Sequence, residues 1–189
     1  NEEYMITDAS IKEGNRTTVT YSTANDKEYN EGDKYLTGIL PQTSRRTSKE
    51  EHEGTTLEKL KTYLDTNGEV KVYKDTDKDN NLDITKDTEI KDTDLVGTGM
   101  FIQITKGNKE ITLRLVVRGD ANGDGMTLAN DATIANKYIG KLEHDIVKDD
   151  CYKLAFDADT NGRIIAADNT MITNMASLRC KYAYRTSTK

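Results

Sequence analysis

Two segments near the end of this chain repeat one pattern of oxygen-bearing side chains. The first runs from Asp120 to Asp131 and the second from Asp157 to Asp168. Each has Asp or Asn at positions 1, 3 and 5, Gly at position 6 and Asp at position 12. A hard cation such as calcium takes about six to eight oxygen ligands, which alternate side chains of one loop can supply together. The spacing is that of an EF-hand loop and predicts two bound calcium ions.

The predicted ligands are the side chains at positions 1, 3, 5 and 12 and the backbone carbonyl at position 7. They are Asp120, Asn122, Asp124, Met126 and Asp131 in the first loop, and Asp157, Asp159, Asn161, Arg163 and Asp168 in the second. Position 9 has no side-chain oxygen, so we expect water to complete the shell. Because the carboxylates of each loop repel one another at close range, folding of this segment is expected to be coupled to calcium.

Before residue 118, apolar and polar residues alternate, as in strands with one buried face. Candidate strands lie at 69–73, 100–104 and 111–117, with a further one at 17–21. Antiparallel sheets tolerate one solvated face. We therefore predict a small antiparallel β domain over residues 1–118.

One helix is predicted within this β domain. Thr55 and Glu58 have the spacing of a capping box, with Thr55 as the cap, and Leu57, Leu60 and Leu64 follow at helical spacing. The segment 42–54 is polar and lacks periodicity, so we expect it to be an exposed loop.

The chain after residue 118 is predicted to form a second, all-α domain over residues 119–189. Each loop is followed by a short apolar stripe at helical spacing, and neither stripe could be buried alone, so the two helices are expected to pack on each other. The predicted fold class is thus α+β, with repeats at about 119–141 and 155–180.

The two repeats resemble those of bacterial dockerins with duplicated F-hand calcium loops. The resemblance is carried by Gly119–Ile139 and Ala155–Asp168, including the Asp at position 12 where most EF-hands have Glu. The first loop also follows directly on a predicted strand, so the helices that usually enter EF-hand loops are missing. The resemblance covers about residues 119–182.

This resemblance implies calcium-dependent binding to a cohesin module of a scaffoldin or cell-surface protein. Such pairs assemble extracellular, cellulosome-like complexes that degrade polysaccharides. The family's recognition residues lie at positions 10, 11, 17, 18 and 22, and the Ser-Thr pair usual at positions 10 and 11 is absent here. The corresponding residues are Ala129, Asn130, Asn136, Lys137 and Lys141 in the first repeat, and Ala166, Ala167, Thr173 and Asn174 in the second.

The β segment is similar to the immunoglobulin-like or X-type modules that precede dockerins. Gly97–Met100 at a strand start, and a last strand that runs into the first loop, fit that arrangement. An alternative is a structural module of a bacterial surface protein or adhesin, in which calcium only rigidifies the chain and no cohesin is bound.

A third acidic segment begins like a calcium loop, with Asp75, Asp77 and Asp79 at alternate positions. Position 6 is Asn80 and position 12 is Lys86, so a closing carboxylate is missing at the expected place. We therefore favour a polar hairpin connection here over a third calcium site.

The composition argues against several other functions. A net charge of −6 disfavours nucleic-acid binding, and no apolar run approaches the length of a membrane-spanning helix. The histidines, His52 and His144, lie in polar runs without a catalytic partner, so we expect no enzyme. Cys151 and Cys180 could form a disulfide or remain two thiols. Since the chain begins at Asn1, we expect it to be a segment of a longer protein.

Overall fold

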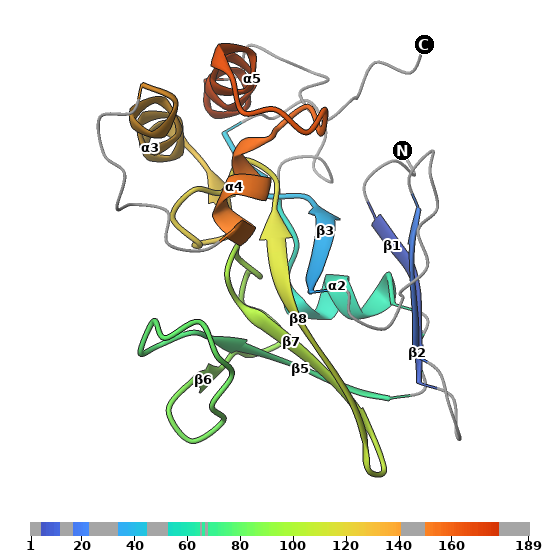
Figure 1. Cartoon of the computed structure of the whole chain (residues 1–189). Coiled ribbons are helices and arrows are strands. Elements are labelled where there is room, and N and C mark those ends of the chain that lie inside the picture. The colour runs from blue at the N-terminus through green and yellow to red at the C-terminus, as the bar shows by residue number, and fades with distance from the viewer. Residues whose placement is uncertain are drawn as a thin grey trace.

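The computed structural model describes residues 5–11, 17–22, 34–44, 53–64, 66, 68–140 and 150–177. Within these ranges the chain has a mixed α/β fold, with a five-stranded sheet in the first part and most helices in the last part (Figure 1). The strands are β1 (Met5–Ile11), β2 (Thr17–Ser22), β3 (Tyr35–Ile39), β4 (Gln42–Thr43), β5 (Glu69–Lys74), β6 (Thr88–Glu89), β7 (Phe101–Lys106), β8 (Lys109–Val117) and β9 (Met126–Thr127). The helices are α2 (Leu57–Thr62), α3 (Ala129–Ile139), α4 (Asp150–Phe156) and α5 (Ala166–Ala176).

The main sheet has the strand order β3-β8-β7-β5-β6. β5, β7 and β8 are antiparallel neighbours, and the β7–β8 hairpin turns at Gly107, which has a φ of 60°. β3 instead runs parallel to β8 and places Tyr35 beside Arg114. The predicted small antiparallel sheet is therefore wrong, because its edge strand is parallel and the sheet is mixed.

One face of the sheet forms the main hydrophobic core. Val72 of β5 pairs with Ile102 of β7, which pairs with Leu113 of β8, and all three side chains are buried. The apolar side of α2 packs on this face through Leu57 and Leu60. The alternating apolar residues of β5, β7 and β8 therefore lie on the face of the sheet that α2 covers.

The helix α2 begins one residue later than predicted. Its N-cap is Thr56, whose hydroxyl accepts a hydrogen bond from the Lys59 amide at 3.2 Å. Thr55 is buried, and its hydroxyl donates to the carbonyl of Leu40 at 2.9 Å. The polar segment before it is also not a simple exposed loop, because Gln42–Thr43 forms β4 and Thr43 is buried.

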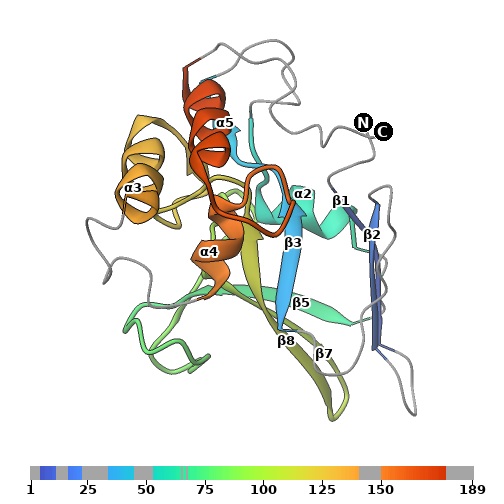
Figure 2. The ribbon, with the colours of Figure 1, turned by 45° about the horizontal axis from the view of Figure 1, so that its top comes forward.

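The prediction of an all-α C-terminal domain is also wrong. β9 lies inside the first acidic loop and pairs in parallel with β4, so a small sheet joins this region to the first part of the chain. In addition, α4 packs on the main sheet, where Cys151 and Ala155 contact Val116 of β8. Figure 2 shows α4 lying against the end of β8.

The second acidic loop does have an entering helix, contrary to the sequence analysis. α4 ends at Phe156 and the loop begins at Asp157, whereas the first loop follows the strand β8 as predicted. Cys180, the other half of the suggested disulfide, lies outside the described residues. None of the described helices combines the length and apolar character needed to span a membrane.

Candidate metal centres

The first acidic loop is closed by the carboxylate of Asp131, which is fully buried at position 12. One of its oxygens accepts hydrogen bonds from the amides of Ala121 (2.9 Å) and Asn122 (3.3 Å), and the other accepts from Leu128 (2.8 Å). Since Asp131 is the third residue of α3, its carboxylate also caps the helix N-terminus. The closing residue therefore joins the start of the loop to the helix that follows it.

Asp120, at position 1 of this loop, is also fully buried. Its carboxylate accepts backbone hydrogen bonds from Gly123 (2.8 Å) and Gly125 (2.9 Å) within the loop. Burial nevertheless raises the pKa of Asp120 to about 7, because the hydrogen bonds from the Thr98 and Gly125 amides offset only part of the lost hydration and the nearby carboxylates of Asp131 and Asp124 add to the rise. A bound divalent cation would favour the ionised carboxylate at this position.

The second loop repeats this hydrogen-bond pattern. The Asp168 carboxylate is fully buried and accepts from the Asp159 amide (3.4 Å) and the Ile165 amide (2.8 Å). Asp157 accepts from the Gly162 amide at 2.8 Å, as Asp120 does from Gly125. Burial raises the pKa of Asp157 as well.

The loop backbones turn at the same two positions. Position 6 has a φ of 79° at Gly125 and 82° at Gly162, and position 4 has a φ of 81° at Gly123 and 58° at Thr160. Glycine takes these left-handed conformations without steric cost, which explains why it stands at three of the four positions.

The two loops differ in how closely their carboxylates approach. In the second loop, Asp157, Asp159 and Asp168 each offer an oxygen, and these atoms lie within 4.8 Å of one another. Such a group suits a hard cation with oxygen ligands. Among the described residues the first loop forms no comparable group, and there one oxygen of Asp120 accepts the amide of Thr98 at 2.8 Å.

The two position-7 residues, whose carbonyls are predicted ligands, lie in different surroundings. Met126 is part of β9 and pairs with Gln42, while Arg163 is exposed. At position 5, Asp124 and Asn161 are both exposed, and each accepts the amide of the residue two positions further on. The two loops therefore share backbone turns and hydrogen bonds but differ in their surroundings at position 7.

Several residues around the first loop were not predicted from the sequence. The Gln42 amide donates to the Gly125 carbonyl at 2.8 Å, and Thr98 donates to Asp120. Gly97 lies so close to the loop that a Cβ there would come 2.1 Å from the carbonyl oxygen of Gly123. The only signal in the sequence was the Gly97–Gly99 stretch, whose glycines permit this close backbone approach.

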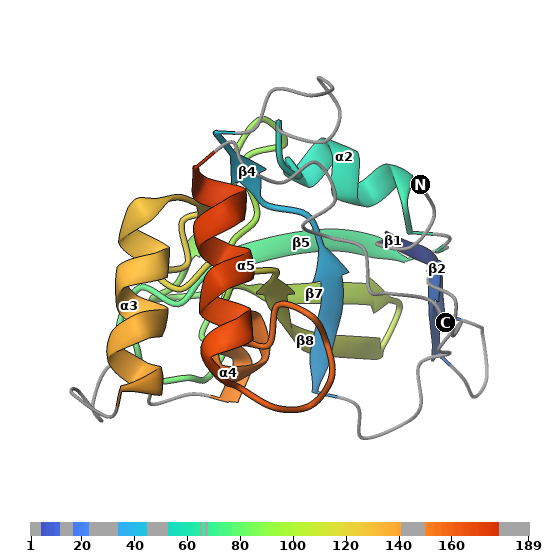
Figure 3. The same ribbon diagram turned by 90° about the horizontal axis from the view of Figure 1, so that it is seen from above.

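The predicted recognition residues lie on α3 and α5, which are side by side (Figure 3). The helices pack through a small core that includes Ala135 and Ile172. Five of the predicted residues are exposed and three are half-buried, while Lys141 lies outside the described residues. The exposed ones are Ala129, Asn130, Asn136, Ala166 and Ala167, and the half-buried ones are Lys137, Thr173 and Asn174.

Position 9 of the second loop adds an apolar side chain to this region, since Ile165 is 46% exposed. The exposed side chains at loop positions 10 and 11, where α3 and α5 begin, are small and uncharged. Such a face can approach another protein without leaving buried charges unpaired.

Comparisons of the chain with protein-family models, with curated proteins and with solved structures give no match.

Proposed function

We propose that this chain is a calcium-dependent docking module that binds a cohesin module of a scaffoldin or cell-surface protein. The observation that carries the proposal is the repeated loop-and-helix unit, in which Asp131 and Asp168 each close an acidic loop onto a helix. The two calcium ions would be held by the ligands at positions 1, 3, 5, 7 and 12. Their role is structural, because they fix the directions of α3 and α5.

The arrangement of α3 and α5 supports this role. Three of the five buried residues in their common core are alanines, Ala121, Ala135 and Ala158, and the other two are Phe156 and Ile172. An alanine side chain adds little to the stability of a core, since each buried methylene contributes only about 0.8 kcal/mol. Ions at the start of both helices would supply what the core lacks and hold one surface in place for a partner.

Binding to cohesins, measured by calorimetry with and without EDTA, tests the proposal. We expect a complex in calcium that is lost when the ion is removed. A complex that forms equally well in EDTA, or no complex with any cohesin of the source organism, would overturn it. The same proposal places the protein outside the bacterial cell, within a complex that degrades polysaccharides.

Single substitutions at position 11 test the surface. Asn130→Arg on α3 and Ala167→Arg on α5 change exposed residues, so folding should be little affected, within about 0.5 kcal/mol. If a helix contacts the cohesin, its variant should lose at least about tenfold in affinity, because a buried unpaired charge is costly. Asn108→Arg, in the exposed β7–β8 turn, is the matched control.

A second function is favoured by one observation. The first loop is hydrogen-bonded to Gln42 and Thr98, so a calcium ion there would also stiffen the joint with the main sheet. In that case the chain would be a calcium-stabilised structural module of a surface protein or adhesin. A calcium-dependent rise in thermal stability without binding to any cohesin would favour this function.

A further inference from the structure

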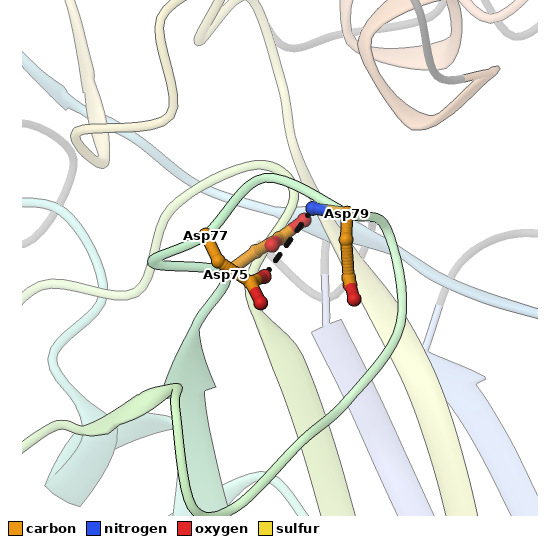
Figure 4. A group of neighbouring side chains, drawn as sticks. All are labelled: Asp75, Asp77 and Asp79. Atoms are coloured by element: carbon orange, nitrogen blue, oxygen red, sulfur yellow. Dashed lines mark hydrogen bonds between the residues drawn. The ribbon is translucent and has the colours of Figure 1, made fainter.

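The connection between β5 and β6 holds a third group of close carboxylates. It is a hairpin connection, as expected, because Tyr73 pairs with Glu89 and Lys74 pairs with Thr88. Asp75, Asp77 and Asp79 lie together on it (Figure 4), each with an oxygen within 4.8 Å of the others. Exposed acidic groups are common without an ion, so this group needs independent support before it can be considered a binding site.

That support comes from Asp75. Its side chain is only 9% exposed, yet its Oδ1 atom is buried without a hydrogen-bond donor. A buried carboxylate oxygen without a partner costs free energy, because no hydrogen bond replaces the water that it has lost. The neighbours in the group, Asp77 and Asp79, can only accept hydrogen bonds when ionised. A cation is the partner that satisfies all three.

The other oxygen of Asp75 is already used, and this fixes the orientation of the carboxylate. Its Oδ2 accepts from the Asn80 amide at 3.2 Å and from the Arg114 guanidinium at 3.3 Å. Arg114 itself is held over the Phe101 ring, 4.5 Å from its centroid, and donates to the Gly99 carbonyl. Arg114 thus holds Oδ2 and leaves Oδ1 without a partner, and outer-shell groups orient metal ligands in the same way.

The missing closing carboxylate is supplied by Asp87, one position later than in the other two loops. Asp87 is buried and accepts from the Thr76 amide (2.9 Å) with one oxygen and from the Asp83 amide (2.9 Å) with the other. Those donors are at positions 2 and 9 of the connection. They correspond to Ala121 and Leu128, the two donors to Asp131 in the first loop.

We propose that the β5–β6 connection, from Asp75 to Asp87, is a third calcium-binding loop with one extra residue before its closing carboxylate. Its backbone agrees with the other loops, since Lys78 at position 4 and Asn80 at position 6 have φ values of 58° and 65°. The ligands would be the Asp75, Asp77 and Asp79 carboxylates, the Asn81 carbonyl and the closing carboxylate of Asp87. This site lies on the main sheet and is independent of the docking surface.

The side chain of Lys86 competes with the ion. It stands at position 12, and its ammonium lies 3.4 Å from the Asp77 carboxylate and 3.3 Å from the Asp83 carboxylate. Because the Lys86 side chain is 56% exposed, it can turn into solvent when a doubly charged ion enters. The third loop is therefore expected to bind calcium more weakly than it would without this lysine.

Counting the calcium ions on the whole chain by native mass spectrometry tests the proposal. The wild type should carry three ions, and the Asp77→Asn, Asp79→Asn double variant should carry two. Asp150→Asn, which removes an exposed carboxylate of α4, is the control and should keep three. An equal count in the wild type and the double variant would overturn the proposal.

This result is independent of the two C-terminal loops. If those loops failed to bind calcium while the third did, the wild type would carry one ion and the double variant none. Should the double variant fold poorly, a calcium titration of the wild type followed by NMR gives a second reading. The amides of Asn80 and Asn81 should shift with calcium, and unchanged signals there would count against the site.

Lys86→Gln gives a test in the opposite direction. Removing the competing ammonium should tighten calcium binding at the third loop by about two- to fivefold, the range expected for an exposed ion pair. Lys91→Gln, an exposed lysine beyond the connection, should leave the affinity unchanged. Equal or weaker binding in Lys86→Gln would contradict the assigned position of the ion.

Discussion

At the scale of single residues, Asp131 and Asp168 each join an acidic loop to the helix behind it. Both are fully buried, and both accept the amide of position 9 at 2.8 Å. Replacing either by Asn removes the closing charge and puts an amide group opposite a backbone donor. We expect calcium affinity at the altered loop to fall at least about tenfold, or about 1.4 kcal/mol.

Isothermal titration with calcium measures this effect. Each single variant should lose one tight site and keep the other, with Asp150→Asn as the control for loss of an exposed charge. Unchanged affinity in both variants would show that position 12 does not contribute a ligand in this chain.

The titration of Asp120 should set the pH dependence of the calcium-free protein. Burial raises its pKa from 3.8 to about 7 in the folded state, so the folded chain holds this proton more tightly than the unfolded chain. The resulting stability is fully present below pH 3.8 and is lost as pH rises through about 7. One such group changes the free energy of unfolding by at most about 1.4 kcal/mol per pH unit.

Urea unfolding in EDTA at pH 5, 6 and 7 should therefore show stability falling by about 1 to 3 kcal/mol over this range. In excess calcium the decline should disappear, because the ion keeps the carboxylate ionised in the folded state. An equal decline in both conditions would show that calcium does not contact Asp120.

The sequence indicated where the two acidic loops lie but not how they close. Oxygen side chains at fixed spacing located the segments that begin at Asp120 and Asp157, and in both segments the Asp at position 12 accepts the amide of position 9. In the β5–β6 connection the same spacing puts Lys86 at position 12, whereas the carboxylate that accepts the amides of positions 2 and 9 is that of Asp87. A single extra residue breaks a spacing rule without changing the hydrogen bonds that the rule represents.

At the scale of elements, the alternating segments at 69–73, 100–104 and 111–117 all became strands of the main sheet. β3 (Tyr35–Ile39) was not predicted as a strand, so its parallel pairing with β8 was not foreseen either. β9 was also missed. Two residues are too few to show any periodicity, and this strand depends on its pairing with β4.

The packing between α3 and α5 depends on a few side chains, of which Ile172 is the most informative. It is fully buried in the shared core, whose other buried members are Phe156 and three alanines. Ile172→Ala should lower the free energy of unfolding by about 2 to 5 kcal/mol, because it removes apolar contacts and leaves a cavity. Thr170→Ala, an exposed change in the same helix, should cost less than about 0.5 kcal/mol.

Chemical unfolding in saturating calcium compares these two variants without the added effect of ion loss. Similar stabilities for the two would mean that the helices are held by their loops alone, and that the shared core contributes little.

At the scale of the whole molecule, the two predicted parts of the chain are in contact through several bonds. The Gly125 carbonyl of the first loop accepts the Gln42 amide, Asp120 accepts the Thr98 amide, and the Thr127 hydroxyl donates to the Arg118 carbonyl at 2.9 Å. A composition shift near residue 118 indicates a change of local structure. It carries no information on whether the two sides pack together, because those contacts join residues that lie apart in the sequence.

Because of these contacts, we expect calcium removal to change the hydrogen exchange of residues outside the loops. The amides of Gln42 and Thr98 donate to the first loop at 2.8 Å, so both should become exposed when that loop opens without its ion. We expect their hydrogen exchange to accelerate by at least about tenfold in EDTA. Amides at the centre of β7 and β8 should keep their protection, because the core between the sheet and α2 contains none of the loop residues.

Hydrogen exchange followed by NMR distinguishes three outcomes. Faster exchange confined to α3 and α5 would show that the first loop keeps its bonds to the sheet without calcium. Uniform acceleration would show that the chain unfolds as one unit. Selective acceleration at Gln42 and Thr98 would show that the first loop transmits ion binding to the sheet.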